Sequence, residues 1–203
     1  MNIDSNIDTA ISHHALRQAT ADAHARIDTI VGGGVHSHVG YAAYLRGMQR
    51  LVVVALQALP GHRELELHAE RLASDLSALR TDALPLTEQP LTGTLKNTDA
   101  GTPMVDPVAR MGWEYVISGA SVGARYLLRQ VQALGYSADH GASFLAGHAG
   151  GDDWPRFLAR LAEAELSAPQ RQSLCSAALA AFAAAEHAFL AAYRPASRIE
   201  TLA

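Results

Sequence analysis

Apolar residues recur at three- and four-residue steps along most of the chain, which is the spacing of one face of an amphipathic helix. The first stripe predicts a helix over about residues 12–30, and the second predicts one over about 39–59. The glycines at 32–34 and the Pro60–Gly61 pair end these stripes, because glycine and proline disfavour continuation of a helix. A third stripe predicts a helix over about 62–79.

The second half of the chain carries more distinct helix-end residues. Asp106 can accept hydrogen bonds from the first free backbone N–H groups, Pro107 suits the first helical position, and Gly135 suits the stop. These residues predict a long helix between Asp106 and Gly135. Ser137 is in position to cap a short helix that reaches about residue 146.

Two further helices complete the pattern. The stretch GHAGGDD at 147–153 predicts a loop, after which Asp152 or Asp153 can cap the next helix. The last helix begins at the Ser167–Gln170 pair, which has the spacing of a capping box, and runs to about Tyr193.

The order of elements predicts an all-α fold, a single-domain bundle of about seven or eight helices. Prolines and glycines between 81 and 107 predict a long irregular connection within it. We expect the helical domain to cover 12–195, with a flexible segment at 1–11 and a tail at 196–203.

Composition narrows the function classes. With 203 residues, 49% of them hydrophobic, the chain can bury one sizeable core. Its net charge of −4 gives no basic surface for nucleic acid or an anionic membrane, so neither is an expected partner. A single cysteine, Cys175, excludes an intrachain disulfide, and the polar start has no signal-peptide pattern. No apolar run approaches the length of a bilayer span, so we expect a cytoplasmic protein.

Two glycines interrupt an apolar helical stretch, EYVISGASVGARYLL at 114–128. Each interior glycine costs a helix about 1 kcal/mol relative to alanine, so a compensating role is expected. Gly119 and Gly123 lie one turn apart on one face, and Ala120 and Ala124 extend the patch of bare backbone. The patch suits either close packing of a second helix or contact with a flat ligand.

His24 is the candidate ligand on the first helix. It lies beside Thr20 and Ile27, at the border of the apolar stripe rather than on the solvent face. A lone histidine at such a border is more often structural. A neutral imidazole nitrogen can also bind iron and leave the opposite coordination position free.

The sequence around His24, LRQATADAHARID at 16–28, resembles the proximal helix of the haem oxygenases, whose Leu-basic-x-Ala-Thr-x-x-x-His pattern ends on the haem-ligating histidine. YVISGASVGARYL at 115–127 is similar to the distal helix of that family, whose glycines approach the haem. The stretch at 144–157 and the closing helix are compatible with bacterial members. The resemblance covers about 14–193.

This resemblance implies an enzyme that degrades haem to biliverdin, carbon monoxide and ferrous iron, using dioxygen and electrons from an external reductase or ferredoxin. It implies that His24 binds the haem iron and that the backbone of 119–124 closes over the other haem face. Arg17 and Tyr115 are the implied partners of the propionates. A phytochrome could receive the bilin.

The resemblance gives catalytic positions to Gly119, Gly123 and Ser121, and adds Ala120 and Ala124 to the haem contacts.

The match to the distal helix is incomplete. Bacterial members often read Tyr-Val-x-Glu-Gly-Ser-x-Leu-Gly-Gly, whereas this chain has Ser118 for Glu, Ala120 for Ser and Ala124 for the last Gly. Ala120 cannot form a side-chain hydrogen bond, so Ser118 or Ser121, or backbone groups alone, would have to hold the distal water. Two alternatives therefore stay open, a haem-binding or sensing protein without turnover and a thiaminase-like all-α enzyme acting on another small ring compound.

The other histidines give no metal-ligand spacing. His36 and His38 lie in a glycine loop, and the His13–His14 pair lies at a helix start. His148 and His187 have no histidine partner one helical turn away. The sequence therefore predicts no zinc site.

Overall fold

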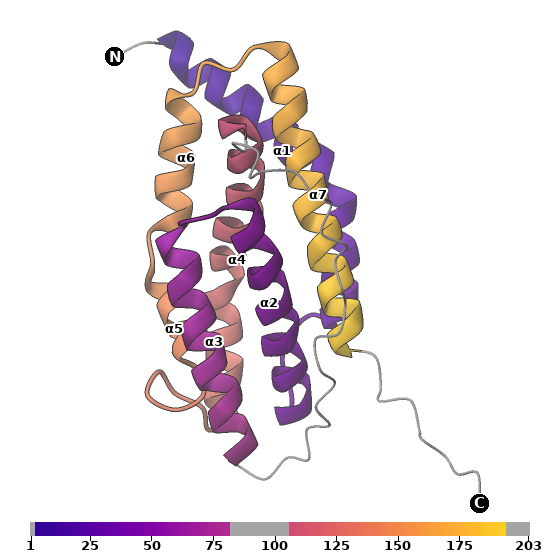
Figure 1. The fold of residues 1–203 in the computed structure, drawn as a ribbon, viewed down its shortest axis with the longest axis vertical. Coiled ribbons are helices and arrows are strands. Elements are labelled where there is room, and N and C mark those ends of the chain that lie inside the picture. The colour runs from indigo at the N-terminus through magenta and orange to yellow at the C-terminus, as the bar shows by residue number, and fades with distance from the viewer. Residues whose placement is uncertain (1–2, 82–105, 194–203) are drawn as a thin grey trace, which may run out of the picture.

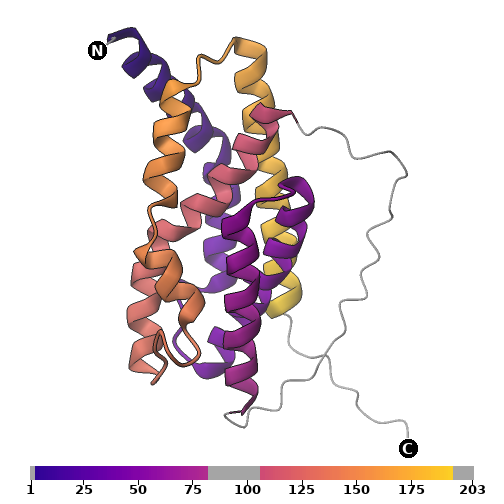
Figure 2. The ribbon, with the colours of Figure 1, turned by 60° about the vertical axis from the view of Figure 1, so that its left-hand side comes forward.

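The computed structural model describes residues 3–81 and 106–193, which Figures 1 and 2 show as a bundle of long helices. Seven α-helices and no strand form within these two ranges. The prediction of an all-α bundle of about seven or eight helices is confirmed. In chain order the helices are α1 (Ile3–Val31), α2 (His38–Ala58), α3 (Arg63–Thr81), α4 (Pro107–Ala133), α5 (Ser143–Gly150), α6 (Asp153–Glu163) and α7 (Ala168–Tyr193).

The last helix, α7, packs against three other helices, α1, α2 and α4. The expectation that no apolar run approaches the length of a membrane span is wrong for this helix. Its 26 residues include an 18-residue window of mean hydropathy 1.6, of which 39% is buried. Packing on three neighbours accounts for this apolar composition, since an alanine-rich surface lets helix axes approach closely.

Two hydrophobic clusters share this bundle. One is formed mainly by α2, α3, α5 and the second half of α4, and contains Tyr41, Leu45 and Phe144. The other joins α1, α4, α6 and α7 and contains Leu16 and Phe157. Full burial of one such side chain contributes about 1.5–3 kcal/mol. α1 and α4 are therefore held mainly by the helices that both of them contact, α6 and α7. The two helices make little direct contact with each other.

α4 begins beside α7 and diverges from it toward its C-terminal end (Figures 1 and 2). Gly112 makes the close approach possible. A Cβ at this position would lie 2.6 Å from the carbonyl oxygen of Leu174 and 2.6 Å from the Cβ of Ala177. The first half of α4 is therefore locked to α7 by a glycine contact, and the second half is free to leave it.

Several helix ends follow the sequence signals. Asp106 caps α4 by accepting the N–H of Val108 at 3.1 Å, and Gly135 follows the helix with φ +95°. Gln170 accepts the N–H of Ser167 at 2.8 Å. The Ser167 hydroxyl bonds the same Gln170 oxygen instead of a backbone N–H, so half of the capping box forms.

Other boundaries differ from the prediction. α1 begins at Ile3 rather than near residue 12. Ser137 caps no helix, because its backbone closes a tight turn with His140, and α5 starts at Ser143 and continues through the expected loop to Gly150. The expected irregular connection and C-terminal tail lie outside the described residues.

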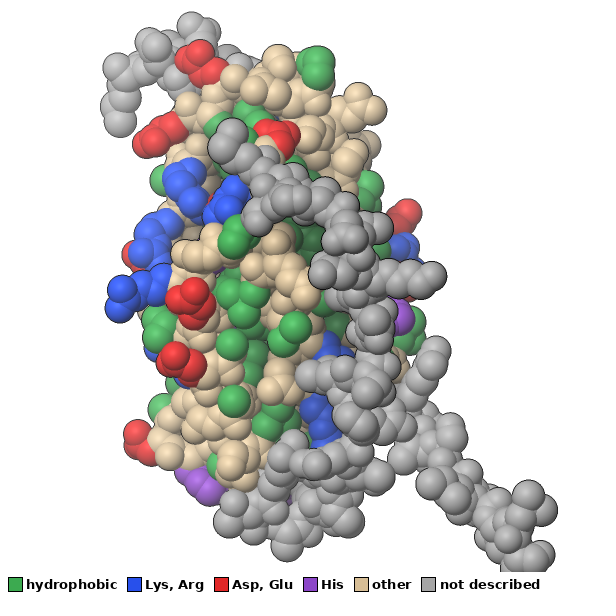
Figure 3. Space-filling view, in the orientation of Figure 1, with side chains coloured by type: hydrophobic (Ala, Val, Ile, Leu, Met, Phe, Trp, Pro, Cys, Tyr) green, Lys and Arg blue, Asp and Glu red, His purple; other side chains and the backbone are tan. Residues whose placement is uncertain are grey.

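Charged side chains gather along the left edge of Figure 3, over α6 and its surroundings. Arg156 pairs there with Asp152 and Asp153, and Arg160 pairs with the buried Glu114 of α4 at 2.9 Å. This edge of the bundle is therefore polar and charged.

Replacing Gly112 by alanine should destabilise the protein by about 1–3 kcal/mol, because the new methyl group meets backbone atoms of α7 that cannot move aside. Gly123→Ala is the matched control. A Cβ at Gly123 would meet nothing within 4 Å, so this change should be neutral or stabilise the helix by about 0.5–1 kcal/mol. Urea unfolding of the two variants measures the difference, and equal effects would contradict the assignment.

Candidate functional site

The two glycines singled out in the sequence do not serve helix packing. A Cβ on Gly119 would make only ordinary contact, 3.5 Å from the Trp154 ring, and one on Gly123 would meet nothing within 4 Å. Val122 and Tyr126 flank them and are 65% and 52% exposed. We call Gly119, Val122, Gly123 and Tyr126 the open face of α4, because helical spacing puts them on one side of the helix.

Two contacts connect the ends of this open face to α1. At one end, the Trp154 ring of α6 lies against Gly119 and contacts the ring of His13 in α1, with 5.8 Å between centroids. At the other end, Gln130 of α4 accepts the N–H of Val35, just after α1, at 2.9 Å. The stretch between these contacts is about 16 Å of α4 at the rise of a helix.

His24 lies on α1 between the same two contacts. It follows His13 by three helical turns, so both rings lie on the side of α1 that meets Trp154. One flank of the His24 ring is 6.0 Å from the Phe182 ring, and the side chain is 65% exposed. The sequence predicted a border position rather than the solvent face, and the exposure of the side chain contradicts that prediction, although one flank of the ring lies near Phe182.

A carboxylate orients the His24 ring. The Nδ1 of His24 lies 2.9 Å from an oxygen of Asp28, one turn further along α1. A carboxylate at Nδ1 favours the tautomer whose proton is on Nδ1, which leaves the Nε2 lone pair for a ligand. Histidines that bind metals are commonly held in this way. The pair therefore fits an iron ligand, and no other described residue bonds Nε2.

Arg17 and Tyr115 have different surroundings. Arg17 precedes His24 by two turns, is exposed, and lies on the same side of α1. Tyr115 packs between the rings of Trp154 and Phe157, at 5.7 and 5.9 Å. Core packing accounts for Tyr115, while Arg17 stays available to an anionic group beside His24.

The structure does not bring every predicted residue to the open face of α4. Ser121 lies on the opposite side, where its hydroxyl donates to the Ser118 carbonyl at 2.6 Å. The Ser118 hydroxyl is buried and donates to the Glu114 carbonyl at 2.5 Å. Ala124 is fully buried in the core, and Ala120 is half-buried beside it. Helix rotation therefore turns Ser121 and Ala124 away from Gly123, and the structure does not bring them to the open face of α4.

Comparison with known proteins decides the family. The family model described as Heme oxygenase matches residues 12–191, which is most of the chain. The chain belongs to the haem oxygenase family. No curated protein matches it, but its fold is similar to that of the Neisseria meningitidis haem oxygenase in its NO- and CO-bound crystal structures. That likeness has a TM-score of 0.58 and 24% identity, and covers 90% of this chain and 92% of the other. The family match gives no support to the thiaminase-like alternative.

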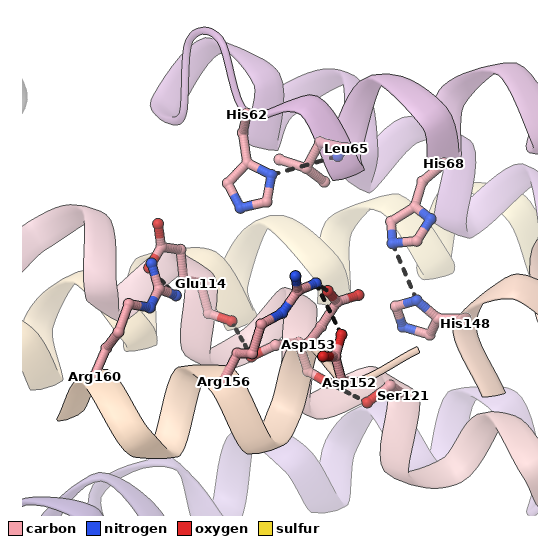
Figure 4. Close-up of polar contacts among 11 residues, drawn as sticks. His62, Leu65, His68, Glu114, Ser121, His148, Asp152, Asp153, Arg156 and Arg160 are labelled. Atoms are coloured by element: carbon pink, nitrogen blue, oxygen red, sulfur yellow. Dashed lines mark hydrogen bonds and ion pairs between the residues drawn. The ribbon is translucent and has the colours of Figure 1, made fainter. Parts of the chain in front are cut away.

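This haem oxygenase chain also has a second cluster that sequence reasoning missed. His68 of α3 and His148 of α5 are buried, and their rings meet with His148 Nδ1 3.1 Å from His68 Nε2 (Figure 4). Asp153 of α6 lies beside them, so that each residue offers a ligand atom within 4.8 Å of the others. The sequence showed no metal-ligand spacing for His148, because the other members of this group lie on other helices.

Burial makes both rings poor bases. Desolvation lowers the pKa of His68 to about 4, with further lowering by His148, Arg71 and His62 and an opposing effect of Asp153. Desolvation also lowers the pKa of His148 to about 4, opposed by Asp153 and assisted by Arg71. Both imidazoles are therefore neutral at pH 7, and each keeps one unprotonated nitrogen.

The free energy of unfolding should fall as the pH drops from 7 to 5 in the presence of a chelator. The folded-state pKa values lie below the ordinary value of 6.5, so the unfolded chain binds more protons between pH 6.5 and 4. The two rings together should account for roughly 2–4 kcal/mol of this loss. Urea unfolding of wild type and His148→Gln at both pH values tests it, and an unchanged pH dependence in the variant would contradict the assignment.

Proposed function

We propose that this chain is a cytoplasmic haem-degrading oxygenase that converts haem to biliverdin, carbon monoxide and ferrous iron, with dioxygen and electrons from an external reductase or ferredoxin. One observation carries the proposal. Gly119 and Gly123 cost α4 stability without any packing contact to explain them, and the exposed His24 lies between the same two α1–α4 contacts. A flat ligand between α1 and α4 accounts for both features.

The chain's own residues would bind and position the haem there. His24 would hold the iron through Nε2, with Asp28 fixing its ring. Gly119 and Gly123 would let the α4 backbone approach the opposite haem face. Arg17 would pair with a propionate, because guanidinium and carboxylate form strong charge-assisted hydrogen bonds. Haem supplies the iron and porphyrin reactivity, so the protein's part is position and exclusion of water.

A second candidate is a haem-binding or sensing protein without turnover. Ser118 and Ser121 bond backbone carbonyls on the far side of α4, and Ala120 has no polar group. The hydroxyl of Tyr126 is then the side-chain hydroxyl on the open face of α4. This arrangement gives less side-chain support for a distal water than the common bacterial pattern, so backbone groups and Tyr126 would have to provide it.

His24→Ala should weaken haem binding at least tenfold and change the absorption spectrum of the complex, because the iron loses its protein ligand. His36→Ala, in the loop after α1, is the matched control and should bind haem as wild type does. Titration of haem into each purified protein, followed by absorption spectroscopy, measures both effects. Wild-type affinity and spectrum in His24→Ala would refute His24 as the ligand.

Gly123→Leu should abolish bilin formation, because the leucine would occupy the space proposed for haem on the open face of α4. The helical circular-dichroism spectrum should stay intact, because a Cβ at this position meets nothing within 4 Å. The wild-type haem complex, supplied with a reductase or ascorbate under air, should yield a bilin absorption band. Haem binding without bilin under either reductant would favour the candidate without turnover. Normal turnover by Gly123→Leu would contradict the placement of haem against α4.

A further inference from the structure

The cluster of His68, His148 and Asp153 (Figure 4) contains no residue of the proposed haem site. Two of its members line a pocket with Glu114, Ile117 and Ser118 of α4, none of which belongs to the open face. Its three residues come from α3, α5 and the first turn of α6. His68 and Asp153 line a pocket of about 450 Å³ that also contains Glu64, Glu114 and other residues. The cluster therefore adjoins a partly open pocket through His68 and Asp153.

The hydrogen bond between the two rings leaves each of them unsatisfied. Two neutral imidazoles have two N–H donors and two acceptor nitrogens, and one ring-to-ring bond uses one of each. The remaining nitrogens, His68 Nδ1 and His148 Nε2, are buried and have no partner. Their residues are 3% and 2% exposed, so solvent does not replace the missing bonds. These two nitrogens lie on the far edges of the rings, so the nitrogens that could share one ion are the facing His68 Nε2 and His148 Nδ1.

The same geometry suits two ligands of one metal ion. Nitrogens bound to a tetrahedral zinc ion at about 2.0–2.1 Å lie about 3.3 Å apart, close to the observed ring-to-ring distance. Asp153 uses one carboxylate oxygen to accept from Arg156 at 2.6 Å, and the other oxygen stays available to the cluster. Two histidines and one carboxylate are a common set for zinc and ferrous iron, with positions left for water.

The charges around the cluster also favour a cation. The adjoining cavity is lined by Glu64, Asp152 and Asp153 against Arg71 and Arg156, which leaves one net negative charge when the histidines are neutral. Arg71 lies close enough to disfavour a positive charge at both rings, whereas Asp153 favours one.

We infer that His68, His148 and Asp153 form a binding site for one divalent transition-metal ion of the zinc or ferrous type, separate from the haem site. The ion would join α3, α6 and the short helix α5, which has only eight residues. Metal binding would thus stabilise the folded chain by mass action. This inference does not depend on haem turnover.

Titration of Zn²⁺ into the full-length, haem-free protein by calorimetry tests the site. We expect one equivalent to bind with submicromolar affinity, and Co²⁺ to give the visible absorption of a low-symmetry complex. Asp153→Asn and His148→Gln should each weaken Zn²⁺ binding at least tenfold. Absence of stoichiometric Zn²⁺ binding at micromolar concentrations would overturn the inference.

Two control variants make the result specific. Arg156→Gln removes the ion pair of Asp153 but keeps all three ligands, so it should retain Zn²⁺ binding, whereas Asp153→Asn should lose it. His24→Ala should also retain Zn²⁺ binding, which separates a failure here from a failure of the haem proposal.

Thermal unfolding gives a second measurement. Zn²⁺ should raise the melting temperature of the wild type but not that of Asp153→Asn, whose replaced side chain is not fully buried. Equal Zn²⁺ affinity in wild type and Asp153→Asn would refute the ligand assignment.

Discussion

The arrangement of this protein depends on how α1 and α4 are held by common neighbours. Both pack against α6 and α7, and their direct contact is slight. Gly112 ties the first half of α4 to α7, and the Trp154 ring of α6 lies between α4 and α1. α6 packs along the first half of α4, from Trp154 against Gly119 to Arg160 paired with Glu114, so none of its printed contacts reaches the second half of α4. The exposed His24 and the open face of α4 both follow from that geometry.

Sequence patterning predicted most of the fold because apolar spacing and end residues are local signals. The helix over 107–133 was predicted with correct bounds, since Asp106 and Gly135 act on their own neighbours. α5 was misplaced, because its first residue follows Ala142, which provides no capping side chain. Its start is fixed instead by Asp75 of α3, which accepts the N–H groups of Ser143 and Phe144. No rule of local spacing reveals a cap supplied from another helix.

The residues of the candidate site also fall into two groups, those whose placement follows from the sequence and those that only the folded structure brings together. Helical periodicity places Gly119 and Gly123 on one side and His24 beside Asp28, so these relations were readable from the chain. The direction of Ser121 also follows from the sequence. Residues two positions apart on a helix point about 200° apart, so Ser121 points away from both Gly119 and Gly123. The cluster on the far side of α4 was not readable, because its members are 80 residues and more apart or belong to different helices. Three-dimensional packing alone brings them together.

The bond between Val35 and Gln130 limits what can lie beside α4. It ties the connection after α1 to α4 at one end, while the indole of Trp154 acts as a spacer at the other. One aromatic ring and one side-chain amide therefore hold α4 at either end of its open face. A molecule lying against that face would have to fit between these two fixed points, which limits its length along the helix.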